Sequence, residues 1–285
     1  MSLISRLSHL RAAAAALAFA PLVTAVSPAG AEPRDAWPAQ VRALYRIDFN
    51  SFDIGTFEFD VGISGRHYTA KGNAQLSALL GAFKWRGLTQ STGTLAGDAP
   101  KPADYLFDYA GSSRSGVIKM GFAGNGVTSL THTPTPPAHS DEIPVREAHL
   151  KSVLDPLSAV MALSRSTTEN PCNRRLAVFD GKQRFDLVLT FNRQETITEA
   201  RPSGQPGIAF VCRVRYEPIA GHRPSDETKA LAMSAGIEVS LRPVPSAKMF
   251  IPHQITIPTG VGPATLTSLR VDIVTPRNEQ IALTQ

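Results

Sequence analysis

The chain has few cysteines, few aromatic residues and no common catalytic motif. It contains two cysteines in 285 residues, and aromatic residues make up 7% of it. The motifs G-x-S-x-G, G-x-G-x-x-G, the P-loop and H-E-x-x-H are all absent. The strongest sequence evidence for a serine hydrolase, a nucleotide-binding enzyme or a zinc protease is therefore missing. We predict no catalytic residue, no cofactor and no metal ligand from motifs.

Charge of either sign is not concentrated anywhere along the chain. There are 29 basic and 24 acidic residues, and they are scattered rather than grouped in blocks. A nucleic-acid-binding protein gathers its basic residues on one face. We therefore expect no nucleic acid among the partners of this protein.

The first 31 residues have the features of a signal peptide. Arg6 and Arg11 give a positive start, residues 12–26 form an apolar run, and residues 29–31 are small. The run is shorter than the roughly 20 residues that span a bilayer, although a retained N-terminal anchor is the alternative. We expect cleavage after Ala31 and export to a Gram-negative-type periplasm.

No second long apolar stretch follows residue 31, so we expect no transmembrane segment in the mature chain.

Cys172 and Cys212 are the two cysteines. In an oxidising compartment an even count favours one disulfide, with two free buried thiols as the alternative. The closed loop would stabilise the fold by about 4 kcal/mol in the chain-entropy model.

Apolar residues alternate with polar ones through much of the chain, which is typical of half-buried strands. Residues 41–50, 57–63 and 68–76 alternate clearly and are joined by short links. The pattern predicts about eleven or twelve strands in a single domain over residues 32–285. We expect an all-β fold, an antiparallel meander forming an open, spiralled or closed β-barrel. Further strands are expected at 105–109, 117–123, 176–179, 185–191, 208–216, 237–241, 251–257 and 265–274.

Helix signals are scarce, and one to three short helices are expected. The best is at residues 155–165, where Asp155 is a good N-cap and Pro156 occupies the first helical position. Residues 77–83 and 224–235 are weaker candidates. Asn125 and Gly126 are expected to form a hairpin turn.

Five apolar residues cluster just after the third alternating segment. Leu79, Leu80, Phe83 and Trp85, with Leu76 before them, fall outside clear strand phasing. Such a segment can plug one end of a barrel, or it can line a ligand cavity at the barrel mouth. We predict Leu79, Leu80, Phe83 and Trp85 as ligand-binding residues, with the plug as the alternative.

Four stretches together resemble a known family. They are the hairpin around residues 45–57 and the sequences DPLSAV at 155–160, FDGKQRFDL at 179–187 and YEPIAG at 216–221. Through them the chain, from about residue 41 to 274, resembles the domain of unknown function family 3108. The resemblance implies an exported protein of Gram-negative bacteria without an established activity, and it carries over no catalytic residue.

Three functional hypotheses follow. The first is a non-enzymatic, envelope-associated periplasmic protein that binds an apolar ligand, a lipid or an envelope protein through a barrel mouth or concave sheet. The second is a hydrolase of envelope polymers, using an acid–base pair such as Asp186 and Glu195. The third is a structural interaction protein that pairs through its sheet edges.

Overall fold

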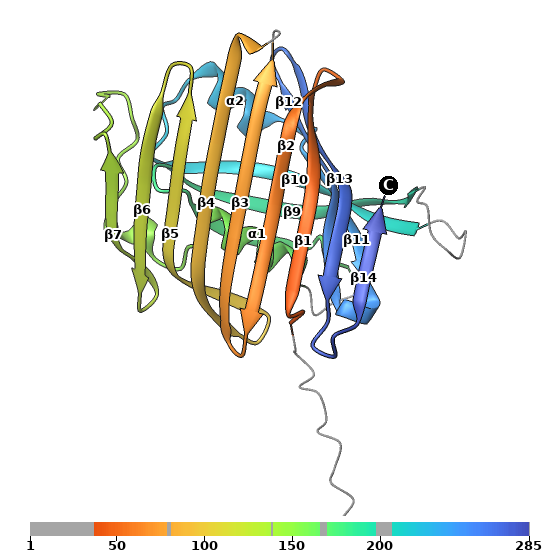
Figure 1. The fold of residues 1–285 in the computed structure, drawn as a ribbon. Helices are drawn as coiled ribbons and strands as arrows, with labels where there is room; N and C mark the ends of the chain where they lie inside the picture. Colours follow the sequence, from red (N-terminus) through yellow and green to blue (C-terminus); the bar gives the residue numbers. More distant parts are fainter. Residues whose placement is uncertain (1–36, 79–80, 138, 166–169, 198–206, 285) are drawn as a thin grey trace, which may run out of the picture. The chain divides into compact units, whose positions relative to one another are not determined.

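A 14-stranded antiparallel sheet dominates the computed structural model, which describes residues 37–78, 81–137, 139–165, 170–197 and 207–284 (Figure 1). The predicted signal peptide lies outside the described residues, and so do Leu79 and Leu80. Residues Asp35–Gln285 form one compact unit. None of the described helices is long and apolar enough to cross a membrane.

The strands form two meanders that meet at one central pair. Consecutive strands are neighbours from β1 to β7 and again from β8 to β13, and β1 pairs with β13. This confirms the predicted all-β antiparallel meander. The strands are β1 Gln40–Phe49, β2 Phe52–Ser64, β3 His67–Ala78, β4 Phe83–Ala96, β5 Ala99–Gly111, β6 Ser115–Ala123, β7 Gly126–Thr133, β8 Arg174–Phe179, β9 Arg184–Ile197, β10 Gly207–Ala220, β11 Glu238–Val244, β12 Met249–Thr259, β13 Gly262–Val274 and β14 Gln280–Thr284.

The sheet is an open rather than a closed barrel. Within the described residues no strand ladder joins β7 to β8, the two ends of the strand order. The segment 151–154 spans this gap with isolated bridges: Lys151 pairs with Gly126 at the start of β7, and Leu154 pairs with Val178 in β8. The segment 151–154 therefore helps to hold the two edges near each other.

The inside of the curved sheet is occupied by helix α1 (Pro156–Ser164), which contacts β3, β4, β5, β8 and β12. Figure 1 shows α1 behind β2–β4, with β9 and β10 crossing behind the same strands. Helices that are buried on most sides are apolar or small all round. The buried residues of α1 are Leu157, Ser158, Ala159, Met161, Ala162 and Ser164.

A buried polar network fixes the start of α1 to the sheet. Asp155 caps the helix by accepting the backbone N–H groups of Leu157 and Ser158, each at 3.0 Å. The other carboxylate oxygen accepts hydrogen bonds from the hydroxyls of Ser158 and of Ser91 in β4, the latter at 2.8 Å. Tyr68 of β3 completes the network, with its hydroxyl 2.7 Å from Ser158 Oγ. Burial raises the pKa of Tyr68 to about 12.

Burial also raises the pKa of Asp155 above its ordinary value of 3.8, against the lowering effect of its hydrogen bonds. The folded protein then holds this proton at pH values where the unfolded chain has lost it. The contribution of Asp155 to the free energy of unfolding is therefore fully present below pH 3.8, and it is lost as the pH rises through the folded-state pKa. We expect urea unfolding of Asp155→Asn to show a weaker decline from pH 4 upward than the wild type. An equal decline would assign the pH dependence to other groups.

The remaining helices are short and lie outside the sheet ladder. Helix α2 (Asp226–Met233) begins after Ser225, whose hydroxyl accepts the N–H of Thr228 at 3.2 Å. Short 3-10 turns occur at η2 (Glu147–Leu150) and η3 (Pro245–Ala247). The helices predicted near residues 155–165 and 224–235 are thus confirmed.

Three local predictions are corrected. The helix expected at residues 77–83 does not include its two ends, because Ser77 and Ala78 end β3 and Phe83 begins β4. The turn after β6 is one residue earlier than predicted, since Gly126 already pairs with Ala123. The expected eleven or twelve strands become 14, because β4, β7 and β14 were not recognised.

The predicted disulfide is present. Cys172 and Cys212 form a disulfide, with their Cα atoms 5.2 Å apart. This bond links β10 to the segment just before β8. Both cysteines are fully buried. They belong to a cluster of buried apolar residues that includes Leu176, Leu189 and Leu241. The bridge therefore lies in a packed core rather than at an exposed, reactive position.

Candidate functional site

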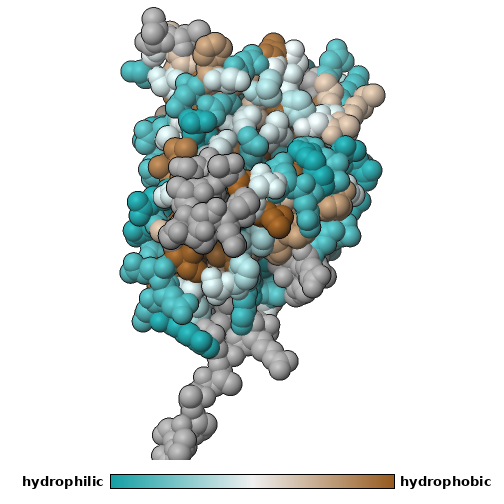
Figure 2. Space-filling model, turned by 90° about the vertical axis from the view of Figure 1, so that its right-hand side faces the viewer, coloured by the Kyte–Doolittle hydropathy of each residue, from teal (hydrophilic) through white to brown (hydrophobic). Residues whose placement is uncertain are grey.

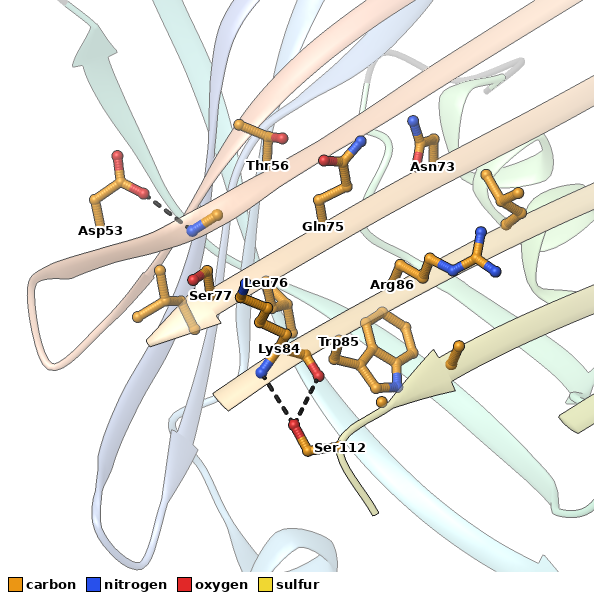
Figure 3. Close-up of a pocket in the computed structure, with 15 residues that line it drawn as sticks. Asp53, Thr56, Asn73, Gln75, Leu76, Ser77, Lys84, Trp85, Arg86 and Ser112 are labelled. Carbon is orange, nitrogen blue, oxygen red and sulfur yellow. Dashed lines mark hydrogen bonds between the residues drawn. The ribbon is translucent and has the colours of Figure 1, made fainter. Parts of the chain in front are cut away.

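A groove of about 990 Å³ lies where four neighbouring strands end. The start of β2, the end of β3, the start of β4 and the end of β5 line it (Figure 3). Consecutive residues along each strand take part, and consecutive side chains point to opposite faces of a sheet. Both faces of the strand ends therefore contribute to the groove, as expected at a rim.

Strand register places the lining residues in two rows across the four strands. One row has Leu76 and Trp85 as its large side chains, with Gly55 and Gly111 beside them. The neighbouring row, on the opposite face, runs Thr56, Gln75, Arg86 and Ala110. The groove thus combines an apolar row with a row of hydrogen-bonding and cationic groups.

Two glycines leave the space that the indole ring of Trp85 occupies. A Cβ atom at Gly87 would lie 2.4 Å from the indole Cη2, and one at Gly111 would lie 2.8 Å from Cδ1. The indole therefore occupies space that any other residue at these positions would fill. Its ring centroid is 6.3 Å from that of Phe107, which stacks in turn on Tyr109 at 5.2 Å. The result is an aromatic row leading inward from the groove.

The opposite wall is shaped by a β-bulge at the start of β2. The register of β1 and β2 shifts between Ile47 and Asp48, so Ile54 is the extra residue. Gly55 has a φ of 155° and approaches β3 so closely that a Cβ would lie 1.9 Å from the carbonyl oxygen of Gln75. Asp53 Oδ1 accepts the N–H of Gly55 at 3.0 Å. Bulges of this kind are common beside functional sites.

Two basic side chains lie in the groove. Lys84 and Arg86 are exposed, and no carboxylate of the described residues forms a salt bridge with either of them. Ser112 pins the end of β5 to the start of β4, since its Oγ accepts the N–H of Lys84 at 3.3 Å. In Figure 3, Thr56, Gln75 and Asn73 lie along one side of the groove, and Lys84, Trp85 and Ser112 along the other. The site can bind a group that is partly apolar and partly anionic.

The predicted ligand-binding residues are only partly brought together here. Trp85 lines the groove. Phe83 begins β4 with 42% of its surface exposed and does not line it. Leu79 and Leu80 lie outside the described residues. Sequence reasoning missed Arg86, on the unrecognised strand β4, and Gln75, on the recognised strand β3, because a single basic or amide residue gives no signal by itself.

A small apolar cavity of about 20 Å³ lies beside α1, lined among others by Trp37, Tyr45 and Met161. This volume holds about one water molecule. Helix α1 therefore packs against this part of the interior through Val160, Met161 and Ser164.

Comparison with known proteins identifies a family without a known activity. The family described as "Protein of unknown function (DUF3108)" matches residues 44–267. No curated protein matches the chain. A solved structure, described as a β-barrel-like protein of domain of unknown function DUF1849 from Brucella abortus, has a TM-score of 0.47 and 9% sequence identity. The alignment covers 84% of this chain and 99% of that one.

Proposed function

Because the chain belongs to the DUF3108 family, whose description names no activity, we propose its function from the groove: it binds an amphipathic ligand with an anionic head. The carrying observation is the groove of about 990 Å³ at the rim of the sheet, which is lined by Leu76 and Trp85 from one face and by Lys84 and Arg86 from the other. Ligand pockets of 300–1,000 Å³ with a few fixed polar groups are typical of small-molecule sites. A lipid or fatty acid of the cell envelope has this chemistry.

The setting of this proposal is the periplasm. The positive start, short apolar run and small residues of positions 1–31 support export with cleavage after Ala31. A disulfide buried in the core supports an oxidising compartment. In this setting the protein is a non-enzymatic, envelope-associated binding protein.

The hydrolase alternative has less support from the geometry. Asp186 and Glu195 are nine residues apart on the same strand, which places them about 30 Å apart. Paired catalytic carboxylates lie within about 10 Å of each other. Asp186 is instead held by ion pairs with Arg175 and Arg184, and Glu195 accepts the hydroxyl of Ser240 at 2.7 Å. These two carboxylates cannot act on one bond together.

The sheet-edge alternative would use β7, one end of the strand order. It contains no Asp, Glu, Lys or Arg, and charged side chains are a common protection of edge strands. The segment 151–154 bridges only to the start of β7, at Gly126. This edge is a second candidate for pairing with an extended segment of another protein.

The binding proposal is tested by titration with oleate and lysophosphatidylglycerol below their micelle concentrations. The chain has two tryptophans, and Trp37 is buried with its indole N–H bonded to the carbonyl of Gly97 at 2.9 Å. We therefore expect a blue shift of tryptophan emission in the wild type and none in Trp85→Phe. A shift of equal size in Trp85→Phe would place the ligand elsewhere.

Calorimetry with the same probes tests the polar half of the site. We expect Arg86→Ala to weaken binding of both anionic probes by about tenfold or more, because a charge-assisted hydrogen bond is lost. Neutral monoolein should bind the variant and the wild type alike. Arg42→Ala on β1, which removes an exposed arginine paired with Asp60, is the control and should change neither affinity. Equal anion affinities for Arg86→Ala and wild type would contradict the proposal.

A further inference from the structure

The most exposed large apolar side chains of the described residues gather at one end of the sheet. Met233, Val261 and Phe52 are 85%, 75% and 74% exposed. Phe52 follows the β1–β2 turn, Val261 lies in the β12–β13 turn and Met233 ends α2. We call these three residues the hairpin rim. Scattered exposed apolar residues are ordinary, but the concentration of the extreme cases at one end is not.

The rim is fixed by contacts between the turns. The backbone N–H of Asn50 donates to the carbonyl of Pro263 at 3.0 Å, and its side-chain amide donates to the carbonyl of Val261 at 2.7 Å. Gly262 allows this approach, since a Cβ there would lie 1.5 Å from Asn50 Oδ1. These bonds hold Phe52 and Val261 at the same end of the sheet.

Helix α2 reaches the same end. Gly236, just after the helix, packs on β12 near its last residues, where a Cβ would be 3.2 Å from the ring of Pro258. Pro258 pairs with Pro263, next to the β12–β13 turn. Met233 therefore projects from a segment that is anchored beside the other two rim residues. This end is the upper one in Figure 1.

The groove opens at this end too. Its residues Asp53 and Lys84 belong to the strand ends beside the β1–β2 and β3–β4 connections. Lys84, Arg86 and Arg114 are exposed there, and none has a carboxylate salt-bridge partner among the described residues. Figure 2 shows separate hydrophobic spots at the upper end of the molecule, set among hydrophilic surface.

We propose that the hairpin rim docks onto a lipid bilayer containing anionic lipids, with the groove facing the membrane surface. The three apolar residues come from separate elements, the start of β2, the β12–β13 turn and the end of α2, whereas a protein interface has a continuous packed centre. Each can instead enter a fluid interface independently. The exposed basic side chains of Lys84, Arg86 and Arg114 have the charge that anionic headgroups attract. The groove would then receive its ligand at the bilayer.

The test is flotation of the purified chain with vesicles of phosphatidylcholine alone and with vesicles that also contain phosphatidylglycerol. We expect binding to the mixed vesicles that falls about tenfold or more in Phe52→Asp and in Val261→Asp, because each variant removes a buried apolar group at the interface. Raising the salt concentration should weaken wild-type binding. Leu130→Asp on β7, which changes a residue 43% exposed, is the matched control and should bind like the wild type.

The outcomes separate docking from ligand binding. Phe52→Asp should keep the wild-type affinity for oleate in solution and the wild-type circular dichroism, since Phe52 does not line the groove. Equal vesicle binding by the wild type and both rim variants would overturn the proposal, as would no binding by the wild type. A concentration-dependent dimer, seen in sedimentation and lost in the same variants, would assign the rim to a second copy of this chain and also overturn it.

Discussion

Asp155→Ala is expected to lower the free energy of unfolding by about 3–5 kcal/mol, one of the two largest effects that the structure predicts. The substitution removes the N-cap of α1 and leaves the hydroxyls of Ser91 and Ser158 without their acceptor. All three residues are fully buried, so water cannot replace the lost bonds without entering the core. Urea unfolding followed by circular dichroism measures the change.

Ser225→Ala provides the matched control. Ser225 is also an N-cap, of α2, but its hydroxyl contacts only Thr228. Losing this cap should cost about 1 kcal/mol. If Asp155→Ala cost no more than Ser225→Ala, the network between α1 and the sheet would contribute nothing beyond ordinary capping. The account of α1 as a helix fixed inside the sheet would then be wrong.

Removing the disulfide by replacing Cys172 and Cys212 with alanine is expected to cost a similar amount, about 4 kcal/mol. The bond closes a loop of 40 positions, and opening it gives the unfolded chain more conformations. Alanine is preferred to serine, because both positions are fully buried and a hydroxyl there would lack a partner.

Guanidinium unfolding with and without reductant checks this prediction. Reductant should destabilise the wild type by the same amount as the double substitution, and it should leave the double variant unchanged. Non-reducing mass spectrometry should show the two cysteines linked in the wild type. Two free thiols in the folded protein, or a wild type insensitive to reductant, would contradict the predicted bridge.

Much of the fold was predictable because most strands bury one face. In β1, buried Val41, Ala43 and Tyr45 alternate with more exposed residues, and this is the pattern that sequence periodicity detects. Helix α1 was predictable from its cap, since Asp155 and Pro156 give a local signal. The position of α1 inside the sheet was not predictable, because a nine-residue helix says nothing about its distant neighbours.

Strand β4 was missed for a physical reason. The residues on its inner face include Gly87, Ser91 and Gly93, which lack the large apolar side chains that mark a strand. They are small because other groups occupy the space: a Cβ at Gly93 would lie 2.7 Å from the Tyr68 hydroxyl. Close approach of the indole of Trp85 requires Gly87 in the same way. Tight packing therefore removed the periodic pattern from the strand that carries the candidate site.

The candidate site was predictable only through its apolar half. Trp85 stood out as part of a cluster that did not fit the strands recognised from the sequence. Arg86 could not be selected, because its position beside Gln75 and Ala110 depends on pairing with β3 and β5. Register between strands is set by the whole sheet rather than by local sequence. The hairpin rim likewise joins turns that are about 200 residues apart in the chain, as the bond from Asn50 to Val261 shows.

The most direct test of the central claim is photo-crosslinking with a fatty acid that carries a diazirine in its acyl chain, followed by peptide mapping. The account predicts crosslinks on the strand ends that contain Leu76, Trp85 and Leu88, and their loss on competition with oleate. Crosslinks confined to the interior residues around Met161, or labelling that excess oleate does not reduce, would contradict ligand binding in the groove.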